Sequence, residues 1–305
     1  MRADGHGRRR VQKKTRRDSV KHARAAVGTK QGVTVVKLCS KVGMTAQNYY
    51  KQTRHRKARE MDDGLVVELV CGVRRVHPRI GGRKLSEVLR EDLAEAGIKL
   101  GRDRMFDLLR RHDLLVPRLP KTPRTTDSRH SLPVFRNLVS DLETTAPNQI
   151  WVSDITYVRV GSRFVYLSLI TDRHSRKIVG HHCSEGLESL GCVKALEKAL
   201  ADLPSDRYPI HHSDRGCQYC CHEYVDRLRS RDLPVSMTEH NHCYENAHAE
   251  RVNGILKQEY GLRMVFKDKE QARLAIVEAV MLYNDHRPHM SLGYRTPTSV
   301  HQHVV

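Results

Sequence analysis

The chain has 305 residues, 39% of them hydrophobic, and a formal net charge of +19. This length is enough for two or three domains, and this hydrophobic content excludes a chain that is disordered throughout. So large a positive surplus attracts polyanions, which makes nucleic acid the first partner to consider. A basic structural protein, for example a ribosomal one, fits the same composition.

The sequence contains no run of 18 apolar residues, and therefore no candidate membrane span. Its first residues are basic, but no apolar segment follows them, so a secretory signal is not expected. The eight cysteines are scattered through a chain of ordinary size, which favours free thiols in a reducing compartment over a disulfide scaffold. We therefore expect a cytoplasmic protein with no membrane partner.

The first predicted segment is a basic tail at residues 1–30. It holds eleven Lys and Arg residues against two Asp, and almost none of its side chains could bury an apolar face. We therefore predict that this tail is disordered. Two interpretations of it remain open: an arm that binds phosphates, and a solvated tail or upstream extension without a role.

A helical region is predicted next, over residues 31–116. In its first part, spaced valine and leucine residues give one apolar helix face, Gly43 ends that helix, and Thr45 caps a second one. Two helices joined by a short turn with glycine resemble a helix-turn-helix, whose second helix would present Gln47 and Lys51 to a major groove. Many helical hairpins of this form bind no DNA, so that alternative stays open.

Further apolar repeats with helical spacing follow up to residue 116, separated by turns at 78–82 and 97–101. Lys and Arg cover their polar faces, which fits either phosphate contact or plain solvation. Residues 117–147 contain five prolines among Ser, Thr and Arg residues, and this composition predicts a partly extended linker. The linker separates the basic helical half from a region of different periodicity.

From residue 148 to residue 305 the sequence predicts an α/β domain. Three strand patterns joined by short turns indicate antiparallel neighbours, and helices then alternate with two shorter strands. This order predicts a mixed five-stranded sheet with flanking helices, and the pair Asp268 and Gln271 predicts a capping box at the last helix. The predicted strands are 150–158, 163–170, 177–182, 209–213 and 233–237, and the predicted helices are 188–202, 221–231, 246–261 and 269–284.

Three carboxylates stand out in this domain. Asp154 interrupts the apolar run of the first strand, where a carboxylate is costly unless it is paired, hydrogen-bonded or bound to metal. Asp214 follows the fourth strand, at the edge where α/β folds place ligands. Glu250 lies on the helix 246–261. Carboxylates from two strands and a helix can converge on hard cations, although each of them alone is more commonly a salt bridge or a helix cap.

A basic side chain accompanies these carboxylates. Lys257 lies seven residues after Glu250, which places both on one helix face two turns apart, with Asn253 between them. A cation beside metal-binding carboxylates is well placed to hold a phosphate backbone. Two metal ions about 3.5–4 Å apart can stabilise both the attacking and the leaving oxygen of a phosphoryl displacement, without a covalent intermediate on the protein.

With these residues the sequence resembles the retroviral-integrase-like DDE transposases of bacterial insertion sequences, and in particular the second-open-reading-frame product of the insertion-sequence-three family. Asp214 and Glu250 are separated by 35 residues, the spacing typical of that family. The likeness is strong over about 145–300 and looser over about 35–116. The matching segments are Trp151–Tyr157, His212–Tyr219, Tyr244–Lys257 and Tyr283–Pro297.

The resemblance implies an RNase H-like fold in which Asp154, Asp214 and Glu250 are the catalytic residues and bind two Mg²⁺ ions, with Mn²⁺ as a usual substitute. It implies an enzyme that nicks DNA at the ends of its element and joins the freed 3′-hydroxyl to a target phosphate. Such an enzyme works as a homo-oligomer on DNA, at the bacterial nucleoid. The side chains expected to contact DNA are Lys257, Asn253, Arg251, Arg215, Gln47 and Lys51.

The family's first-frame product normally supplies a helix-turn-helix and a coiled coil, and no sustained heptad is visible here. The chain is therefore expected either to need that protein as a partner or to be part of a frameshifted fusion. An alternative function is a DNA-binding regulator that keeps the fold without catalysis, but the intact carboxylate triad favours an active transposase. A ribonuclease H is disfavoured by the basic helical half.

A zinc site is the alternative for the cysteines, since Cys217 and Cys220 have ligand spacing. We do not expect zinc, because retroviral integrases place their zinc site ahead of the catalytic domain. Positions 217, 220 and 221 are often Ser, Thr or aliphatic in the family. The candidate zinc set is Cys217, Cys220, Cys221 and His222, with His240, His242 and Cys243 further on.

Overall fold

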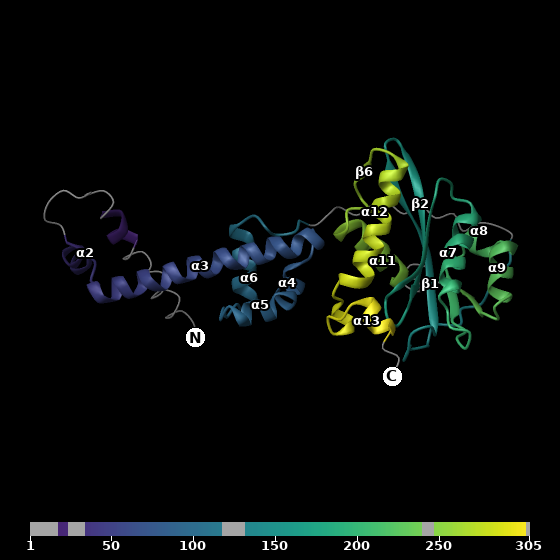
Figure 1. The fold of residues 1–305 in the computed structure, drawn as a ribbon, viewed down its shortest axis with the longest axis horizontal. Coiled ribbons are helices and arrows are strands. Elements are labelled where there is room, and N and C mark those ends of the chain that lie inside the picture. The colour runs from purple at the N-terminus through teal and green to yellow at the C-terminus, as the bar shows by residue number, and fades with distance from the viewer. Residues whose placement is uncertain (1–17, 24–33, 118–131, 240–246, 303–305) are drawn as a thin grey trace. The chain divides into compact units, whose positions relative to one another are not determined.

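The chain divides into two compact units, Met1–Leu69 and Val70–Val305, and the second contains the predicted carboxylates (Figure 1). In the part of the chain that the structure describes, no helix is long and apolar enough to cross a membrane. The computed structural model describes residues 18–23, 34–117, 132–239 and 247–302.

The first unit is helical. Residues 18–23 form a short helix, and α2 (Val35–Lys41) and α3 (Ala46–Val76) follow. Between α2 and α3 the chain turns through a glycine in the left-handed region, with φ of 64°. Thr45 Oγ1 then accepts a hydrogen bond of 3.2 Å from the Asn48 amide. The predicted turn and the predicted cap are both confirmed.

The helix at 18–23 lies inside the stretch for which we predicted disorder. Its Val20 side chain is 1% exposed and packs with Cys39 and Tyr49. The prediction for residues 1–30 is therefore wrong at 18–23, because an apolar side chain in this basic stretch has a partner in α2 and α3. The rest of 1–30 lies outside the described residues.

Three further helices confirm the predicted helical region. Most side chains at the predicted apolar positions of these helices are buried, among them Leu85, Leu89 and Leu108, whereas Val88 is 39% exposed. Arg and Lys residues occupy many of the remaining positions, and these are exposed or half-buried. The helices are α4 (Gly82–Val88), α5 (Arg90–Glu95) and α6 (Arg102–Arg111).

The core of the second unit is a six-stranded sheet of order β3-β2-β1-β4-β5, with β6 paired to β1 outside this path. β2 is antiparallel to both β1 and β3, whereas β4 is parallel to both β1 and β5. This mixed topology confirms the predicted RNase H-like α/β fold, and adds the two-residue strand β6, which is too short to leave a pattern in the sequence. The strands are β1 (Ile150–Val160), β2 (Arg163–Asp172), β3 (Ile178–Ser184), β4 (Ile210–Ser213), β5 (Val235–Met237) and β6 (Val265–Phe266).

Helices cover both faces of this sheet (Figure 1). One core contains Trp151 and Ile170 and is closed by a first group of helices. The other contains Val158 and Leu167 and is closed by a second group. Alternate side chains of each strand therefore serve opposite cores, as the strand period of two requires. The first group is α7 (Ser189–Ala201), α8 (Cys217–Cys220) and α9 (His222–Arg229), and the second is α11 (Ala247–Glu259) and α12 (Lys269–Met281).

Residues 132–147, which belong to the predicted linker, form no helix or strand but lie against the core. Leu132 and Phe135 pack on the α7 side. Val139 is buried with Ile150 of β1. This part of the predicted linker thus packs on the α/β core.

The C-terminal segment is fastened to the sheet by side-chain hydrogen bonds. Tyr283 Oη donates to the Arg176 carbonyl oxygen at 3.0 Å. The Asn284 amide accepts from the Ile178 backbone N–H at 2.9 Å and donates to its carbonyl oxygen at 3.0 Å. The predicted N-cap at Asp268 is confirmed, since its side chain accepts from the Gln271 backbone N–H, whereas the Gln271 side chain accepts from the Lys267 N–H rather than from the Asp268 N–H of a capping box. The last elements are the π-helix η1 (Leu282–His286), the 3-10 helix η2 (Met290–Leu292) and α13 (Pro297–Gln302).

Candidate active site

Asp154 lies in the middle of β1, on the face of the sheet that α11 covers. Its neighbour Ile155 packs against the core on the α7 side, whereas Val152 packs with Ala249 of α11. Because side chains alternate along a strand, Asp154 shares the face of Val152. Its Oδ2 accepts a 2.7 Å hydrogen bond from Asn253 Nδ2, and its Oδ1 accepts one of 2.9 Å from the Ile155 amide.

Asp214 is the first residue after β4. β1 and β4 are parallel neighbours, and Val152 lies opposite His212. Asp154 and Asp214 each follow this pair by two residues, so the sheet brings both carboxylates to one edge. The Gly216 amide donates to Asp214 Oδ1 at 3.0 Å and shapes the turn that holds the carboxylate there.

The carboxylates act on each other through charge. Burial raises the pKa of Asp154, and the negative charge of Asp214 raises it further, to about 7, while the hydrogen bonds from Ile155 and Asn253 lower it. Glu250, in the first turn of α11, adds a smaller contribution that also raises this pKa. The three predicted carboxylates therefore share one environment with excess negative charge.

Of the other two carboxylates, Asp214 has the larger effect on the pKa of Asp154 and Glu250 has the smaller one. Within the described residues, no group of three His, Cys, Asp or Glu side chains lies close enough to hold a metal ion. Glu250 is nevertheless near enough to influence Asp154 electrostatically. The arrangement is thus an aspartate pair with a third carboxylate within electrostatic range.

Asn253, which we expected to contact DNA, is placed differently by the structure. Its side chain is 7% exposed and donates to Asp154. Asn253 lies one turn after Glu250 on the same helix face, and that spacing is the signal in the sequence that could have identified its role. The residue links the helix of Glu250 to the strand of Asp154.

Lys257 lies one turn after Asn253 on α11. Its Nζ sits 4.0 Å from the centre of the Tyr157 ring, in a cation–π contact. Burial lowers the pKa of Lys257, and the charge of Asp154 opposes that shift. A half-buried ammonium group therefore accompanies the carboxylates, as the spacing from Glu250 predicted.

A cavity of about 490 Å³ opens beside the aspartate pair. Asp154 and Asp214 form part of its wall, and most of the remaining wall is aromatic or aliphatic. Cys217, which is exposed, lies at its rim. Sequence reasoning did not anticipate this cavity, because its aromatic members look like ordinary strand residues. They are Tyr157, Phe164 and Tyr166 of the strands, with Tyr219 of α8 as a fourth aromatic member, and Leu187 lies with them.

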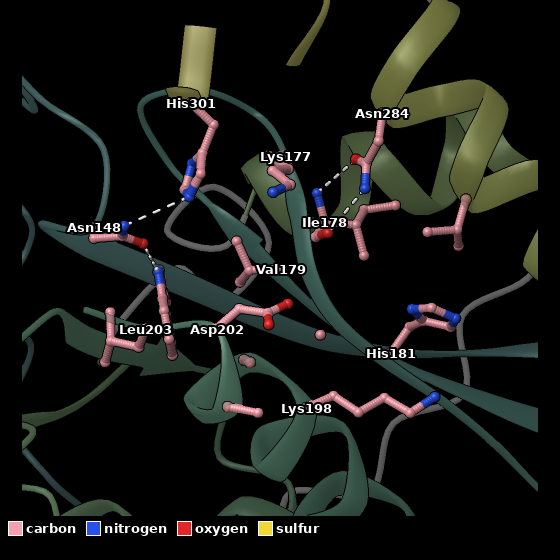
Figure 2. A pocket seen from close by; sticks show the side chains of 15 residues that line it. Asn148, Lys177, Ile178, Val179, His181, Lys198, Asp202, Leu203, Asn284 and His301 are labelled. Carbon is pink, nitrogen blue, oxygen red and sulfur yellow. Dashed lines mark hydrogen bonds between the residues drawn. The ribbon is translucent and has the colours of Figure 1, made fainter. Parts of the chain in front are cut away.

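A second cavity, of about 480 Å³, lies elsewhere in the unit, among β3, α7 and the C-terminal segment (Figure 2). Its wall includes the charged or titratable side chains of Lys177, His181, Lys198 and Asp202. Figure 2 shows the hydrogen bonds between Asn284 and Ile178 at one side of it. None of the three predicted catalytic carboxylates lines this cavity, so we place the candidate active site at the first one.

The other side chains predicted to contact DNA differ in exposure. Gln47 and Lys51 are exposed on the first turns of α3, and Arg251 is exposed on α11. Arg215 is half-buried, and its Nε donates to the Thr238 carbonyl oxygen at 2.7 Å, which ties the loop of Asp214 to the end of β5. Arg215 thus has a structural contact beside any contact with DNA.

The described members of the alternative zinc set make ordinary packing contacts. The Cys220 thiol is buried against Met237 Sδ at 3.7 Å, and burial raises the pKa of Cys220 to about 11. The Cys221 thiol donates to the Gln218 carbonyl oxygen at 3.2 Å. Residues 240–243 lie outside the described part of the chain.

Two family models match the core. Both are described as an integrase core domain, one over residues 144–243 and the other over residues 231–297. Together the two matched ranges contain all three predicted carboxylates.

Curated relatives match over most of the chain. A transposase for the insertion sequence element IS629 from Shigella sonnei is 34% identical over 269 residues, or 85% of this chain and 88% of the relative. An IS600 protein of 31 kDa from Shigella sonnei is 34% identical over 86% of this chain and 96% of the relative. The transposase InsF for IS3A from Escherichia coli is 31% identical over 72% of this chain and 75% of the relative. This chain belongs to the insertion-sequence-three family of transposases.

Solved structures also resemble this transposase. The HTLV-2 integrase catalytic core domain in complex with magnesium is 20% identical, with a TM-score of 0.43, over 52% of the transposase and all of that domain. A chain of the simian T-cell lymphotropic virus intasome is 18% identical, with a TM-score of 0.44, over 73% of the transposase and 71% of that chain.

Proposed function

We propose that this transposase cuts DNA strands and joins them at a two-metal site formed by Asp154, Asp214 and Glu250, with Mg²⁺ as the resident ion and Mn²⁺ as a substitute. The raised pKa of Asp154 is the observation that supports this proposal best. It reflects the burial of Asp154 first, and then the negative charge of Asp214. A divalent cation would compensate that charge and keep the carboxylate ionised.

The donor set fits Mg²⁺. Hard cations take oxygen ligands, and Mg²⁺ usually combines one or two carboxylates with water and substrate phosphates. Asp154 and Asp214 supply a pair of carboxylates at one sheet edge. Glu250 supplies the third from α11 and would complete the site by closing towards the pair.

The chain's own residues would position the metal ligands and the DNA. When bound, the metal ions activate the nucleophile and stabilise the attacking and leaving oxygens of the displacement. Asn253 holds the Asp154 carboxylate in one orientation through its 2.7 Å hydrogen bond. Lys257 supplies positive charge beside Asp154, where it would bind the phosphate backbone of the strand to be cut.

The substrates in this proposal are the terminal repeats of an insertion sequence and a target DNA. The relatives are named as transposases of such elements, and the net charge of +19 favours a polyanionic partner. Gln47 and Lys51 are exposed on α3, where they are available to a DNA groove. A first-frame protein of the element would supply further end recognition.

A strand-joining assay tests this function. It combines the full-length protein, labelled DNA with the ends of the flanking element, and Mg²⁺ or Mn²⁺. We expect joined products with the wild type and with Asp206→Asn, which changes an exposed carboxylate outside the site. We expect none with Asp214→Asn or without metal.

Joining that persists in Asp214→Asn, or at full rate in a chelator, would contradict the two-metal proposal. Binding of the ends without nicking by the wild type calls for the first-frame protein to be added. If nicking begins once that protein is present, the result supports an enzyme whose activity depends on this partner. Continued binding without nicking indicates a non-catalytic regulator and rejects the proposal.

The proposed reaction also requires two catalytic subunits, because two DNA ends must be brought together. We expect monomers or weak association in free protein and a complex with at least two subunits on paired ends. Mass photometry with and without end DNA measures this. Single subunits on paired ends would exclude the expected assembly.

A further inference from the structure

We infer that the cavity beside Asp154 and Asp214 receives a nucleobase that leaves the double helix next to the scissile phosphate. The inference rests on the proposed function, since the base belongs to the DNA that the carboxylates would cut. It adds a binding site that the cutting reaction itself does not require, because phosphoryl transfer involves only the sugar–phosphate backbone of the DNA.

Aromatic surface dominates the cavity near the carboxylates. Phe164 is 42% exposed and Leu187 is 49% exposed, so both present apolar surface that the described residues leave uncovered. Tyr157 meets Phe164 edge to face, with ring centres 5.2 Å apart, and Tyr166 lines the same wall. The volume of about 490 Å³ is within the range of pockets that enclose small ligands, roughly 300–1,000 Å³.

Polar groups lie at defined places in this apolar wall. Thr156 and Gln218 both line the cavity. Gln218 Nε2 donates to the Leu187 carbonyl oxygen at 2.8 Å, which joins α8 to the segment after β3 and closes one side. A mostly apolar wall with a few placed polar groups is typical of sites for flat heteroaromatic ligands.

Among the parts of DNA, the base is the one that fits this wall. Phosphate and sugar gain little from aromatic surface, whereas a base can stack on aromatic side chains whatever its sequence. Asp154 and Asp214 both border this cavity, so a strand whose phosphate reaches those carboxylates would bring its neighbouring base to the cavity. Lys257 and Tyr157 extend the surface along the backbone of that strand.

The inference can be tested by binding without metal, so that catalysis does not enter. Fluorescence anisotropy would compare fully paired end DNA with duplexes that carry one mismatch at each position around the cleavage site. A mismatched base costs less to unstack. We expect one mismatch position to tighten wild-type binding by about tenfold, the scale of one base–aromatic contact.

Variants then assign this gain to the cavity. We expect it to disappear in Phe164→Ala and to remain in Tyr208→Ala, which removes an aromatic ring that is 56% exposed elsewhere. Phe164→Leu keeps an apolar side chain and tests whether loss of folding explains the result, since it should fold normally and still lose most of the gain.

Equal binding of paired and mismatched DNA by the wild type, or a gain that survives in Phe164→Ala, would overturn the inference. The nicking assay separates this outcome from failure of the proposed function. If the wild type nicks DNA but binds mismatched and paired DNA equally, the proposed function is supported and the base site is rejected. A gain without nicking, even after the first-frame protein is added, supports the base site and rejects the catalytic proposal.

Discussion

Asn253 shows how a single side chain determines the orientation of a carboxylate. Its hydrogen bond to Asp154 joins residues that are 99 positions apart in the sequence and connects α11 with β1. Partners of metal-binding carboxylates orient them, and losing such a partner typically lowers metal affinity or activity 10- to 100-fold. Asn253 therefore belongs to the proposed site although it need not touch DNA.

We expect Asn253→Ala to reduce strand joining by about 10- to 100-fold, most strongly at limiting Mg²⁺, because Asp154 loses its donor. Titration of Mg²⁺ in the joining assay measures the effect. Gln258→Ala, which changes an exposed side chain on the same helix, serves as the control. Identical metal titrations for wild type and Asn253→Ala would show that the bond does not support the site.

At the scale of elements, α11 is held at its C-terminal end by a buried ion pair. Arg287 donates to both oxygens of Glu259 at 2.8 and 2.7 Å, and Lys84 Nζ lies 3.1 Å from Glu259 Oε1. The Arg287 side chain is 3% exposed and that of Glu259 is 21% exposed. The Tyr-Asn-Asp-His-Arg-Pro segment typical of the family thus anchors the helix that bears Glu250.

We expect Arg287→Ala to lower the free energy of unfolding of the core by about 3–5 kcal/mol, because it leaves Glu259 without its main partner in a partly buried site. Urea unfolding can be followed by the fluorescence of Trp151, the one tryptophan of the chain. Arg273→Ala, which breaks an exposed pair with Glu270, should have little effect. Equal losses in both variants would argue against the anchor.

The same anchor predicts a dependence on pH. Burial alone would raise the pKa of Glu259, but the hydrogen bonds and charge of Arg287, followed by the charge of Lys84, outweigh burial and lower it. A carboxylate with a lowered folded-state pKa stabilises the protein above its unfolded pKa of about 4.3, and this stabilisation is lost as pH falls through the folded value.

Wild-type unfolding should therefore become easier as pH falls below about 4.3, and Glu259→Gln should lack this part of the pH dependence. Urea midpoints from pH 6 to pH 3 measure it, with Glu278→Gln as a control for an exposed carboxylate. If the urea midpoints of wild type and Glu259→Gln change equally with pH, Glu259 does not cause this pH dependence.

Sequence patterns predicted most of the elements because periodicity is local. The apolar run at 150–158 corresponds to an observed strand, and the apolar repeat at 85–93 corresponds to observed helices. Contacts between distant residues left no such pattern, and the pairing of Glu259 with Arg287 was missed for that reason. At the candidate site, Asp154 was predicted from its place inside an apolar strand, Asp214 from the end of a strand, and Glu250 from its helix, together with the family resemblance. The aromatic cavity was not, because Phe164 and Tyr166 follow an ordinary strand pattern.

At the scale of the whole molecule, positive charge is spread over both units, and residues 1–17 hold eight Lys and Arg residues. Removing them would leave the helix at 18–23 in place. If these residues bind phosphates, the deletion should make the plot of log affinity against log salt shallower by about 0.9 for each phosphate that the protein no longer neutralises. Anisotropy titrations between 50 and 200 mM salt measure this slope, and an unchanged slope would rule out a phosphate-binding arm.

Cys217 gives the candidate site a means of covalent capture. Its thiol is exposed at the rim of the cavity, three residues after Asp214. An oligonucleotide with a disulfide-activated tether on one base would react with it by thiol exchange, and the positions that react would trace the route of the strand across the protein. Replacing Cys71, the other exposed cysteine among the described residues, would limit competing capture. The native sequence thus already supplies an attachment point from which a stable protein–DNA adduct can be prepared.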